Sequence, residues 1–158
     1  MPHATKIMTA VDLSGFSSAT VRYSVWLAKK LNAELVMVSV INQRELEMVQ
    51  WPMLNNAHTV SIVDYIDSQV KARKIEMKAL FESTSPDPVQ CRYLVRNGIP
   101  HQELLAAIEE EKPQLLVLGT KGRSNIADVV IGSTARRMFS RSPIPLVILP
   151  AGYEQMPS

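Results

Sequence analysis

The sequence predicts an α/β fold, built as a doubly wound, open, five-stranded parallel sheet. Short apolar runs alternate with segments of helical periodicity, which is the order expected of strands joined by crossover helices. The run Glu34–Ile41 is almost continuously apolar, as expected of a strand covered by helices on both faces. Because 158 residues match one ordinary domain, we expect residues 1–158 to form a single domain around one core.

Five strands are expected, each as a short apolar run: Lys6–Val11, Glu34–Ile41, Val89–Val95, Gln114–Leu118 and Leu146–Leu149. The third run alternates with a period of two, and prolines bound the fifth, so both are predicted to lie at sheet edges. With the strand order 3-2-1-4-5, the winding direction would reverse between the first and fourth strands. In such sheets, ligands bind at that point, beyond the carboxyl ends of the strands.

Four helices are expected from apolar stripes at helical spacing. The first begins with Ser17 or Ser18 as its N-cap, the third runs from Pro100 to before Pro113, and the fourth runs from Ser133 to about Ser140. The stripe of the first helix is Val21, Val25, Ala28 and Leu31, and that of the long second helix is Val63, Ile66, Val70, Met77 and Leu80.

Residues Asn42–His58 show no clear period and are predicted to be irregular. The apolar part of this segment, Met48–Leu54, has three possible roles: a loop packed on the body of the protein, a lid, or a surface for a partner.

Composition excludes several classes of protein. No apolar run approaches the roughly 18 residues needed to span a bilayer, so no membrane association is expected. The formal charge of +2 is too small, and the basic residues too scattered, to indicate nucleic-acid binding. Cys91 is the single cysteine, which excludes an internal disulfide and predicts a small buried apolar side chain. No secretion signal precedes the first strand, which favours the cytoplasm.

A glycine-rich segment follows the fourth strand. Gly119 ends the apolar run that closes with Leu118, Gly122 follows three residues later, and Gly132-Ser133-Thr134 begins the fourth helix. Glycine lets backbone approach a ligand, and a helix start presents N–H groups and hydroxyls to an anion, so the segment predicts a phosphate site. The spacing fits neither the P-loop motif nor the dinucleotide fingerprint, which disfavours a Walker-type NTPase and a typical dehydrogenase.

Asp12 follows the first strand and would face this segment across the point where the winding reverses. Two roles are open for its carboxylate. It can form an Asx turn or cap a helix, or it can bind a ligand or a divalent cation beside phosphates.

The glycine spacing, Gly-2x-Gly-9x-Gly-Ser/Thr, resembles the ATP-binding signature of the universal stress protein family. Further similar pieces are Ala10–Ser14, Val38–Ile41, Gly98–His101 and Pro145–Pro150, so the resemblance spans most of the chain. It implies an adenine nucleotide α-hydrolase-like, Rossmann-like sandwich with strand order 3-2-1-4-5. It also implies a homodimer formed through the last strand, Leu146–Leu149, whose apolar edge would otherwise be exposed.

The resemblance assigns roles to individual residues. Ala10, Asp12 and Val40 would surround the adenine and ribose, with the backbone of Val40 reading the base edge, and Leu118 and Gly119 would flank the ribose. Gly122 would hold its loop near the phosphates, and Gly132, Ser133 and Thr134 would donate to the triphosphate. Lys121 and Arg123 are weaker phosphate candidates. Family members often carry proline in place of Ala10 and histidine in place of Ser39.

The sequence contains no recognisable catalytic base. His3, His58 and His101 are widely separated, and His101 is expected to be a surface or capping residue. We therefore expect a cytoplasmic ATP-binding regulatory or adaptor module of the stress response, with Mg²⁺ or Mn²⁺ held by Asp12 and phosphates, and with an unknown protein partner. Two alternatives remain open: a slow ATPase switch, and a dimeric scaffold that binds AMP or another nucleotide incidentally.

Overall fold

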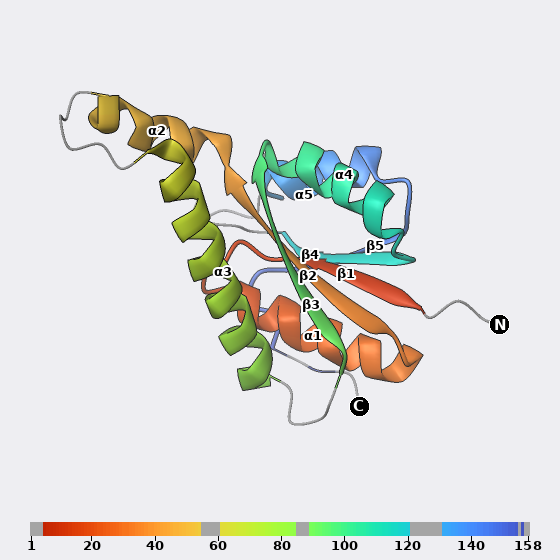
Figure 1. Ribbon diagram of the computed structural model, residues 1–158. Coiled ribbons are helices and arrows are strands. Elements are labelled where there is room, and N and C mark those ends of the chain that lie inside the picture. The colour runs from red at the N-terminus through yellow and green to blue at the C-terminus, as the bar shows by residue number, and fades with distance from the viewer. Residues whose placement is uncertain (1–4, 55–60, 85–88, 121–130, 155, 157–158) are drawn as a thin grey trace.

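The computed structural model describes residues 5–54, 61–84, 89–120, 131–154 and 156, and side chains of 49–54 are not among the features described. Five parallel strands form one sheet in the order β3-β2-β1-β4-β5 (Figure 1). This confirms the predicted fold class and strand order, with β3 and β5 at the edges. The strands are β1 (Lys6–Ala10), β2 (Glu34–Asn42), β3 (Cys91–Gly98), β4 (Leu115–Gly119) and β5 (Leu146–Leu149).

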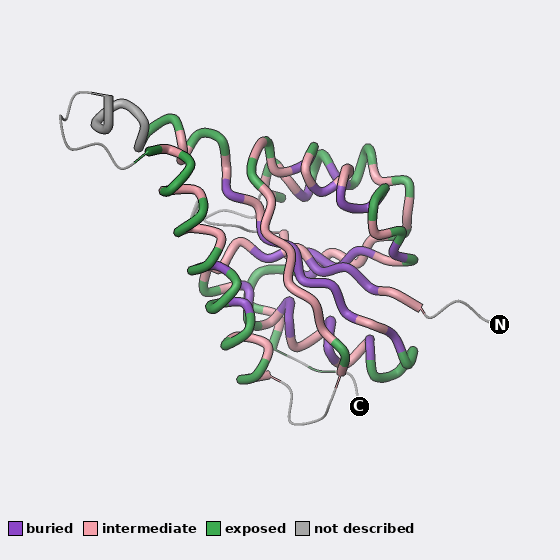
Figure 2. Tube along the Cα trace, viewed as in Figure 1, coloured by how far each residue is buried: buried purple, intermediate pink, exposed green. Residues whose placement is uncertain are grey.

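Helices cover both faces of the sheet. One face lies against α1 and α3, and the other lies against α4 and α5 (Figure 1). Alternating residues of the central strands supply two apolar clusters, so that Ile7 packs toward α1 and Met8 packs toward α4. Figure 2 shows burial concentrated along β1 and β2. The helices are α1 (Ser17–Leu31), α2 (Gln43–Leu54), α3 (Ile62–Thr84), α4 (Pro100–Glu111) and α5 (Ser133–Arg141).

The prediction that Asn42–His58 is irregular is wrong for residues 42–54, because Asn42 ends β2 and residues 43–54 form α2; residues 55–58 lie outside the described residues. Strong helix formers dominate its first turns, and the side-chain oxygen of Asn42 accepts a hydrogen bond from the Arg44 N–H at 3.1 Å. Gln43 and Glu47, one turn apart, are joined at 3.1 Å. The sequence of α2 shows no clear apolar period because the helix projects beyond the sheet, together with the start of α3 (Figure 1).

Three further expectations at helix surfaces are corrected. The N-cap of α1 is Phe16, without a side-chain cap, because the Ser17 hydroxyl bonds elsewhere. Leu31 is exposed, since it is the last residue of α1 before the left-handed Asn32. Val63 is also exposed, because the first turns of α3 extend past the sheet, whereas Met77 is fully buried as expected.

Two residues of β3 lie differently from the expectation. The strand is Cys91–Gly98 rather than Val89–Val95, because its pairing with β2 begins at Leu35/Cys91 and continues to Asn42/Gly98. Cys91 is half-buried rather than fully buried, and it packs against the cluster beneath α1 and α3. Burial raises the pKa of its thiol to about 11, which keeps the thiol protonated and unreactive at neutral pH.

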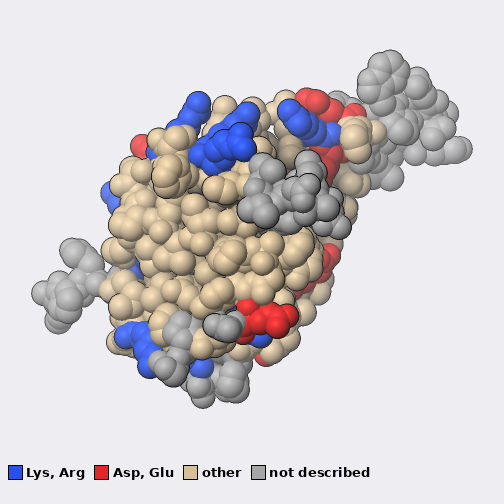
Figure 3. Space-filling model, turned by 180° about the vertical axis from the view of Figure 1, so that it is seen from behind, with Lys and Arg blue, Asp and Glu red and all other residues tan. Residues whose placement is uncertain are grey.

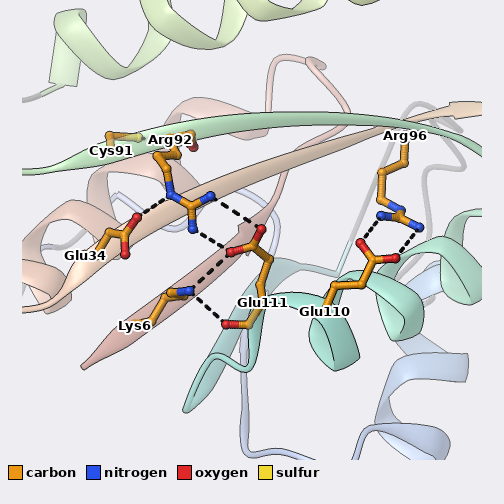
Figure 4. A network of polar contacts seen from close by, with 7 residues as sticks. All are labelled: Lys6, Glu34, Cys91, Arg92, Arg96, Glu110 and Glu111. Carbon is orange, nitrogen blue, oxygen red and sulfur yellow. Dashed lines mark hydrogen bonds and ion pairs between the residues drawn. The ribbon is translucent and has the colours of Figure 1, made fainter. Parts of the chain in front are cut away.

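A ladder of ion pairs joins the amino ends of three strands to the end of α4 (Figure 4). Glu111 lies at its centre and accepts from Lys6 at 3.2 Å and from Arg92, which also bonds to Glu34. Farther along β3, Arg96 pairs with α4 through Glu103 and Glu110. The contacts of Glu111 fasten the β3 edge to α4 at the amino ends of the strands, and those of Arg96 fasten it to α4 nearer the carboxyl end of β3.

Candidate functional site

A pocket of about 420 Å³ lies at the carboxyl ends of β1, β2 and β4, where the winding direction reverses. This volume is in the range of small-molecule sites. The structure brings eight of the predicted site residues together around it: Ala10, Asp12, Val40, Leu118, Gly119, Gly132, Ser133 and Thr134. The other three, Lys121, Gly122 and Arg123, lie outside the described residues.

Asp12 forms the Asx turn that was one of its two expected roles. Its Oδ1 accepts hydrogen bonds from the Ser14 N–H and from the Ser17 hydroxyl, both at 3.0 Å. These bonds hold the loop after β1 against the first turn of α1, with Leu13 between them in a left-handed conformation at φ 62°. The carboxylate also lines the pocket, so the turn and the ligand role are compatible.

The peptide groups of Val40 face the pocket. In β2, residues with even numbers bond toward β1: the Glu34 N–H donates to the Thr5 carbonyl, and the Val38 carbonyl accepts from the Val11 N–H. The pairing of the two strands ends at Ala10 and Val38, one step before Val40. The Val40 N–H and C=O therefore point toward the space beyond β1, side by side as one donor and one acceptor.

The first turn of α5 forms the opposite wall. Gly132 is the N-cap, and its N–H donates to the Thr120 carbonyl at 2.6 Å, which ties the helix start to the end of β4. No side chain caps α5 among the described residues, and the N–H groups of a first helical turn have no partner within the helix. Together with the hydroxyls of Ser133 and Thr134, they make this wall a donor surface with the positive end of the helix dipole.

Sequence reasoning missed a charged cluster beside Val40. Arg73 of α3 is only 5% exposed and lines the pocket with Arg44 and Glu45 of α2. A signal was present in the sequence, because Arg73 completes the regular 4-3-4-3 spacing of the buried stripe Ile66, Val70, Arg73, Met77 and Leu80. A cation on such a stripe needs a buried partner.

The expectation that His101 is a surface or capping residue is wrong. Its side chain is 6% exposed in the first turn of α4, and its Nδ1 lies 3.3 Å from Nη1 of Arg137 on α5. Burial, and then the charges of Arg137 and Arg141, lower the pKa of the imidazole. A neutral ring accepts the hydrogen bond from Arg137, so His101 joins α4 to the helix that forms the donor wall.

Comparison with known proteins identifies the family. The model of the universal stress protein family matches residues 3–150. The chain belongs to this family. Universal stress protein YxiE of Bacillus subtilis is 26% identical over 146 residues, covering 91% of this chain and 97% of that protein. Universal stress protein MJ0577 of Methanocaldococcus jannaschii is 23% identical over 152 residues, covering 91% of this chain and 93% of that protein.

Solved structures of the family share the fold. A structure of MJ0577 has a TM-score of 0.77 at 19% identity, covering 95% of this chain and 98% of that one. The structure of a universal stress protein from Archaeoglobus fulgidus in complex with dAMP has a TM-score of 0.57 at 13% identity, covering 94% and 98%. In the described part of this family member, no helix is long and apolar enough to cross a bilayer.

Proposed function

We propose that this universal stress protein binds ATP in the pocket and acts in the cytoplasm as a nucleotide-dependent regulatory or adaptor module. The observation that carries the proposal is the convergence of four separate segments on one pocket at the point where the winding reverses: the ends of β1, β2 and β4 and the start of α5. The Archaeoglobus fulgidus relative in complex with dAMP supports the choice of an adenine nucleotide.

The Val40 peptide groups suit the edge of adenine. Adenine presents an amino donor next to a ring-nitrogen acceptor, which complements the Val40 C=O and N–H. Guanine presents a carbonyl acceptor and an N–H donor in the opposite order. The Val40 C=O would then face the guanine carbonyl, and the Val40 N–H would face the guanine N–H. In this arrangement, Ala10 and Asp12 flank the base and ribose from β1, while Leu118 and Gly119 flank the ribose from β4.

The start of α5 suits the triphosphate. Gly132, Ser133 and Thr134 line the pocket and offer backbone N–H groups and hydroxyls at the positive end of a helix. By resemblance to the family, Lys121, Gly122 and Arg123, which lie outside the described residues, are further proposed phosphate ligands.

A divalent cation fits one side chain of the pocket. Mg²⁺ is commonly held by one or two carboxylates together with substrate phosphates, and Asp12 is a carboxylate on the pocket wall. No cluster of three or more His, Cys, Asp or Glu side chains suited to a metal occurs among residues that the structure describes. We therefore assign Mg²⁺ or Mn²⁺ to Asp12 and the nucleotide jointly; the cation would neutralise phosphate charge.

Calorimetric titration with ATP and Mg²⁺ tests the proposal. Ser133→Ala removes a hydroxyl from the donor wall and should weaken ATP binding about tenfold, the loss expected for one hydrogen bond to a charged group. Ser140→Ala is the matched control, because Ser140 lies at the other end of α5 and bonds within its own helix. A wild-type protein that does not bind ATP, or a Ser133 variant that binds it unchanged, would contradict the proposal. Mass spectrometry of nucleotide released from the purified protein distinguishes ATP from AMP.

We further propose that the protein forms a homodimer through β5. The strand is apolar and lies at the edge of the sheet, where its outer backbone groups are available for pairing. An adaptor of this kind would present two nucleotide sites to its protein partner.

A further inference from the structure

Arg73 is a buried cation at the end of the pocket that holds Val40. Its Nη1 donates to the Ser39 hydroxyl at 2.9 Å and lies 3.5 Å from the Val40 carbonyl oxygen, and its Nη2 donates to Glu45 at 3.2 Å. One guanidinium thus connects three elements: α3, from which it extends, the end of β2, and the first turn of α2.

Packing alone does not account for this residue. The neighbours of Arg73 on the buried stripe of α3 are Val70 and Met77, and an apolar side chain would complete the stripe without the cost of desolvating a charge. The Glu45 side chain is 39% exposed, so the ion pair is half-solvated and contributes little stability of its own. Beside the Glu45 ion pair, Arg73 makes contacts with the Ser39 hydroxyl and the Val40 carbonyl at the end of β2 that an apolar residue would not make.

We propose that Arg73 is a positioning residue that makes the pocket select adenine over guanine. This inference rests on the proposed function, in which Val40 reads the base. Selection by a backbone donor and acceptor requires that the two peptide groups on either side of Val40 keep their orientation, because rotated groups would no longer oppose the guanine edge. Val40 lies past the end of the pairing with β1, so that strand does not hold it. The opposite edge of β2 stays paired with β3 as far as Asn42/Gly98, and Arg73 adds contacts from α3 to the Ser39 hydroxyl and to the Val40 carbonyl, on the edge that β1 leaves open.

The Glu45 contact completes the positioning. By binding Arg73, Glu45 fixes the plane of the guanidinium and draws the first turn of α2 against the pocket, where Arg44 also lies. A planar fork is required for this geometry, since a lysine ammonium is a point charge on a flexible stem. The residue therefore acts on the base through Val40, without contacting the base itself.

The test compares the affinities for ATP and GTP, each with Mg²⁺, in the wild type and in variants. The wild type should prefer ATP. Arg73→Met should lower the ratio of the two affinities about tenfold, chiefly by weakening ATP binding, and Arg73→Lys should lower it by less. Glu45→Gln should give a smaller change in the same direction. Lys74→Met, which removes the next cation of α3 from an exposed position, is the matched control and should leave the ratio unchanged.

The ratio separates positioning from a purely structural role. If Arg73 only stabilised the fold, its loss would weaken ATP and GTP equally, and that outcome would overturn the inference. An increased preference for ATP would also overturn it, since it would mean that the guanidinium favours a carbonyl on the base. Equal wild-type affinities refute base selection but leave nucleotide binding standing, whereas binding of neither nucleotide refutes both proposals. Should Arg73→Met fail to fold, Arg73→Lys and Glu45→Gln decide by the same ratio.

Discussion

Two ionisable side chains are buried among the residues that the structure describes, one of them in the pocket wall, and each joins neighbouring elements. Arg73 connects α3 to β2 and α2, and His101 connects α4 to α5 through Arg137. Both are more than nine-tenths buried, so each depends on its protonation state and on its partner. The charge of an arginine is permanent, whereas an imidazole can be neutral or charged, and the fold favours the neutral form of His101.

Protonation of His101 should destabilise the protein. The folded state lowers the pKa of this imidazole below its ordinary value of about 6.5, so the unfolded chain binds the proton more tightly. Its contribution to stability is therefore complete above about pH 6.5 and is lost as pH falls through the lower folded pKa. The loss should be at most about 1.4 kcal/mol per pH unit, the limit for a single proton.

Urea unfolding of the wild type and His101→Gln between about pH 7.5 and 5 measures this effect. Glutamine can accept the hydrogen bond of Arg137 but does not titrate. Because His3 and His58 are present in both proteins, the difference between the two stability profiles isolates His101. The wild type should lose more stability than the variant on acidification; parallel profiles would show that His101 does not carry the effect.

At the scale of elements, the β3 edge depends on the ion-pair ladder at the amino ends of the strands. Glu111 is its centre, and the hydrogen bond from Arg92 is the main cause of the lowered pKa of this carboxyl, with Lys6 adding to it against the effect of burial. Because the folded pKa is lowered, the stabilisation is present above the ordinary carboxyl pKa and lost as pH falls through the folded value.

Glu111→Gln should lower the free energy of unfolding by about 1 kcal/mol at neutral pH, since the partners are partly exposed and screened. The deficit relative to the wild type should shrink in acid, where the wild-type carboxyl is protonated as well. Denaturant unfolding at neutral and acidic pH measures both quantities. Glu109→Gln, on the exposed face of the same helix, serves as control, and a deficit equal to that of the control would argue against the ladder.

Elements buried on both faces were predictable from sequence, and projecting elements were not. The continuous apolar run of β2 and the prolines around β5 determine where those strands lie, and both predictions are confirmed. The sequence pattern fails for α2, because a helix that extends past the sheet needs no apolar stripe on its whole length. Likewise, the expected strand Val89–Val95 begins two residues and ends three residues before the observed β3, because the pairing with β2, a contact distant in sequence, sets both ends.

The residues of the site also divide into those that were predictable from sequence and those that were not. Its glycines and hydroxyls follow strands or begin a helix, so local pattern and topology together placed them in one pocket. The roles of Arg73 and His101 were not predicted, because each depends on a partner from another element. The partner of Arg73 is Ser39 of β2, and the partner of His101 is Arg137 of α5. The spacing of the stripe predicts that Arg73 faces the core, but its hydrogen-bond partner, Ser39, is visible only in the folded chain.

At the scale of the whole molecule, the two edges of the sheet differ in charge. The β3 edge carries Arg92 and Arg96, whereas the chain from Ser142 to Tyr153, which includes β5, contains no charged residue. Seen from behind, on the β5 side, the molecule shows a broad face whose middle is free of drawn Lys, Arg, Asp and Glu (Figure 3). Charge protects an edge strand from pairing with another chain, and β5 lacks that protection.

The proposed dimer can be tested by removing one outward-facing donor. The Pro145 and Leu149 carbonyls accept from Leu116 of β4 and from Thr120 just after it, so odd-numbered residues of β5 bond inward and the Ile148 N–H faces the open edge. Ile148→Pro removes that donor while leaving the β4 ladder its partners. Sedimentation equilibrium at micromolar concentration should give twice the 17.6 kDa chain mass for the wild type and a shift toward monomer for the variant. Far-ultraviolet circular dichroism verifies that the variant is folded.

Val147→Pro, whose N–H bonds inward, should instead destabilise the protein itself. A wild type that sediments only as monomer refutes the dimer, and a folded Ile148 variant that stays dimeric places the interface elsewhere.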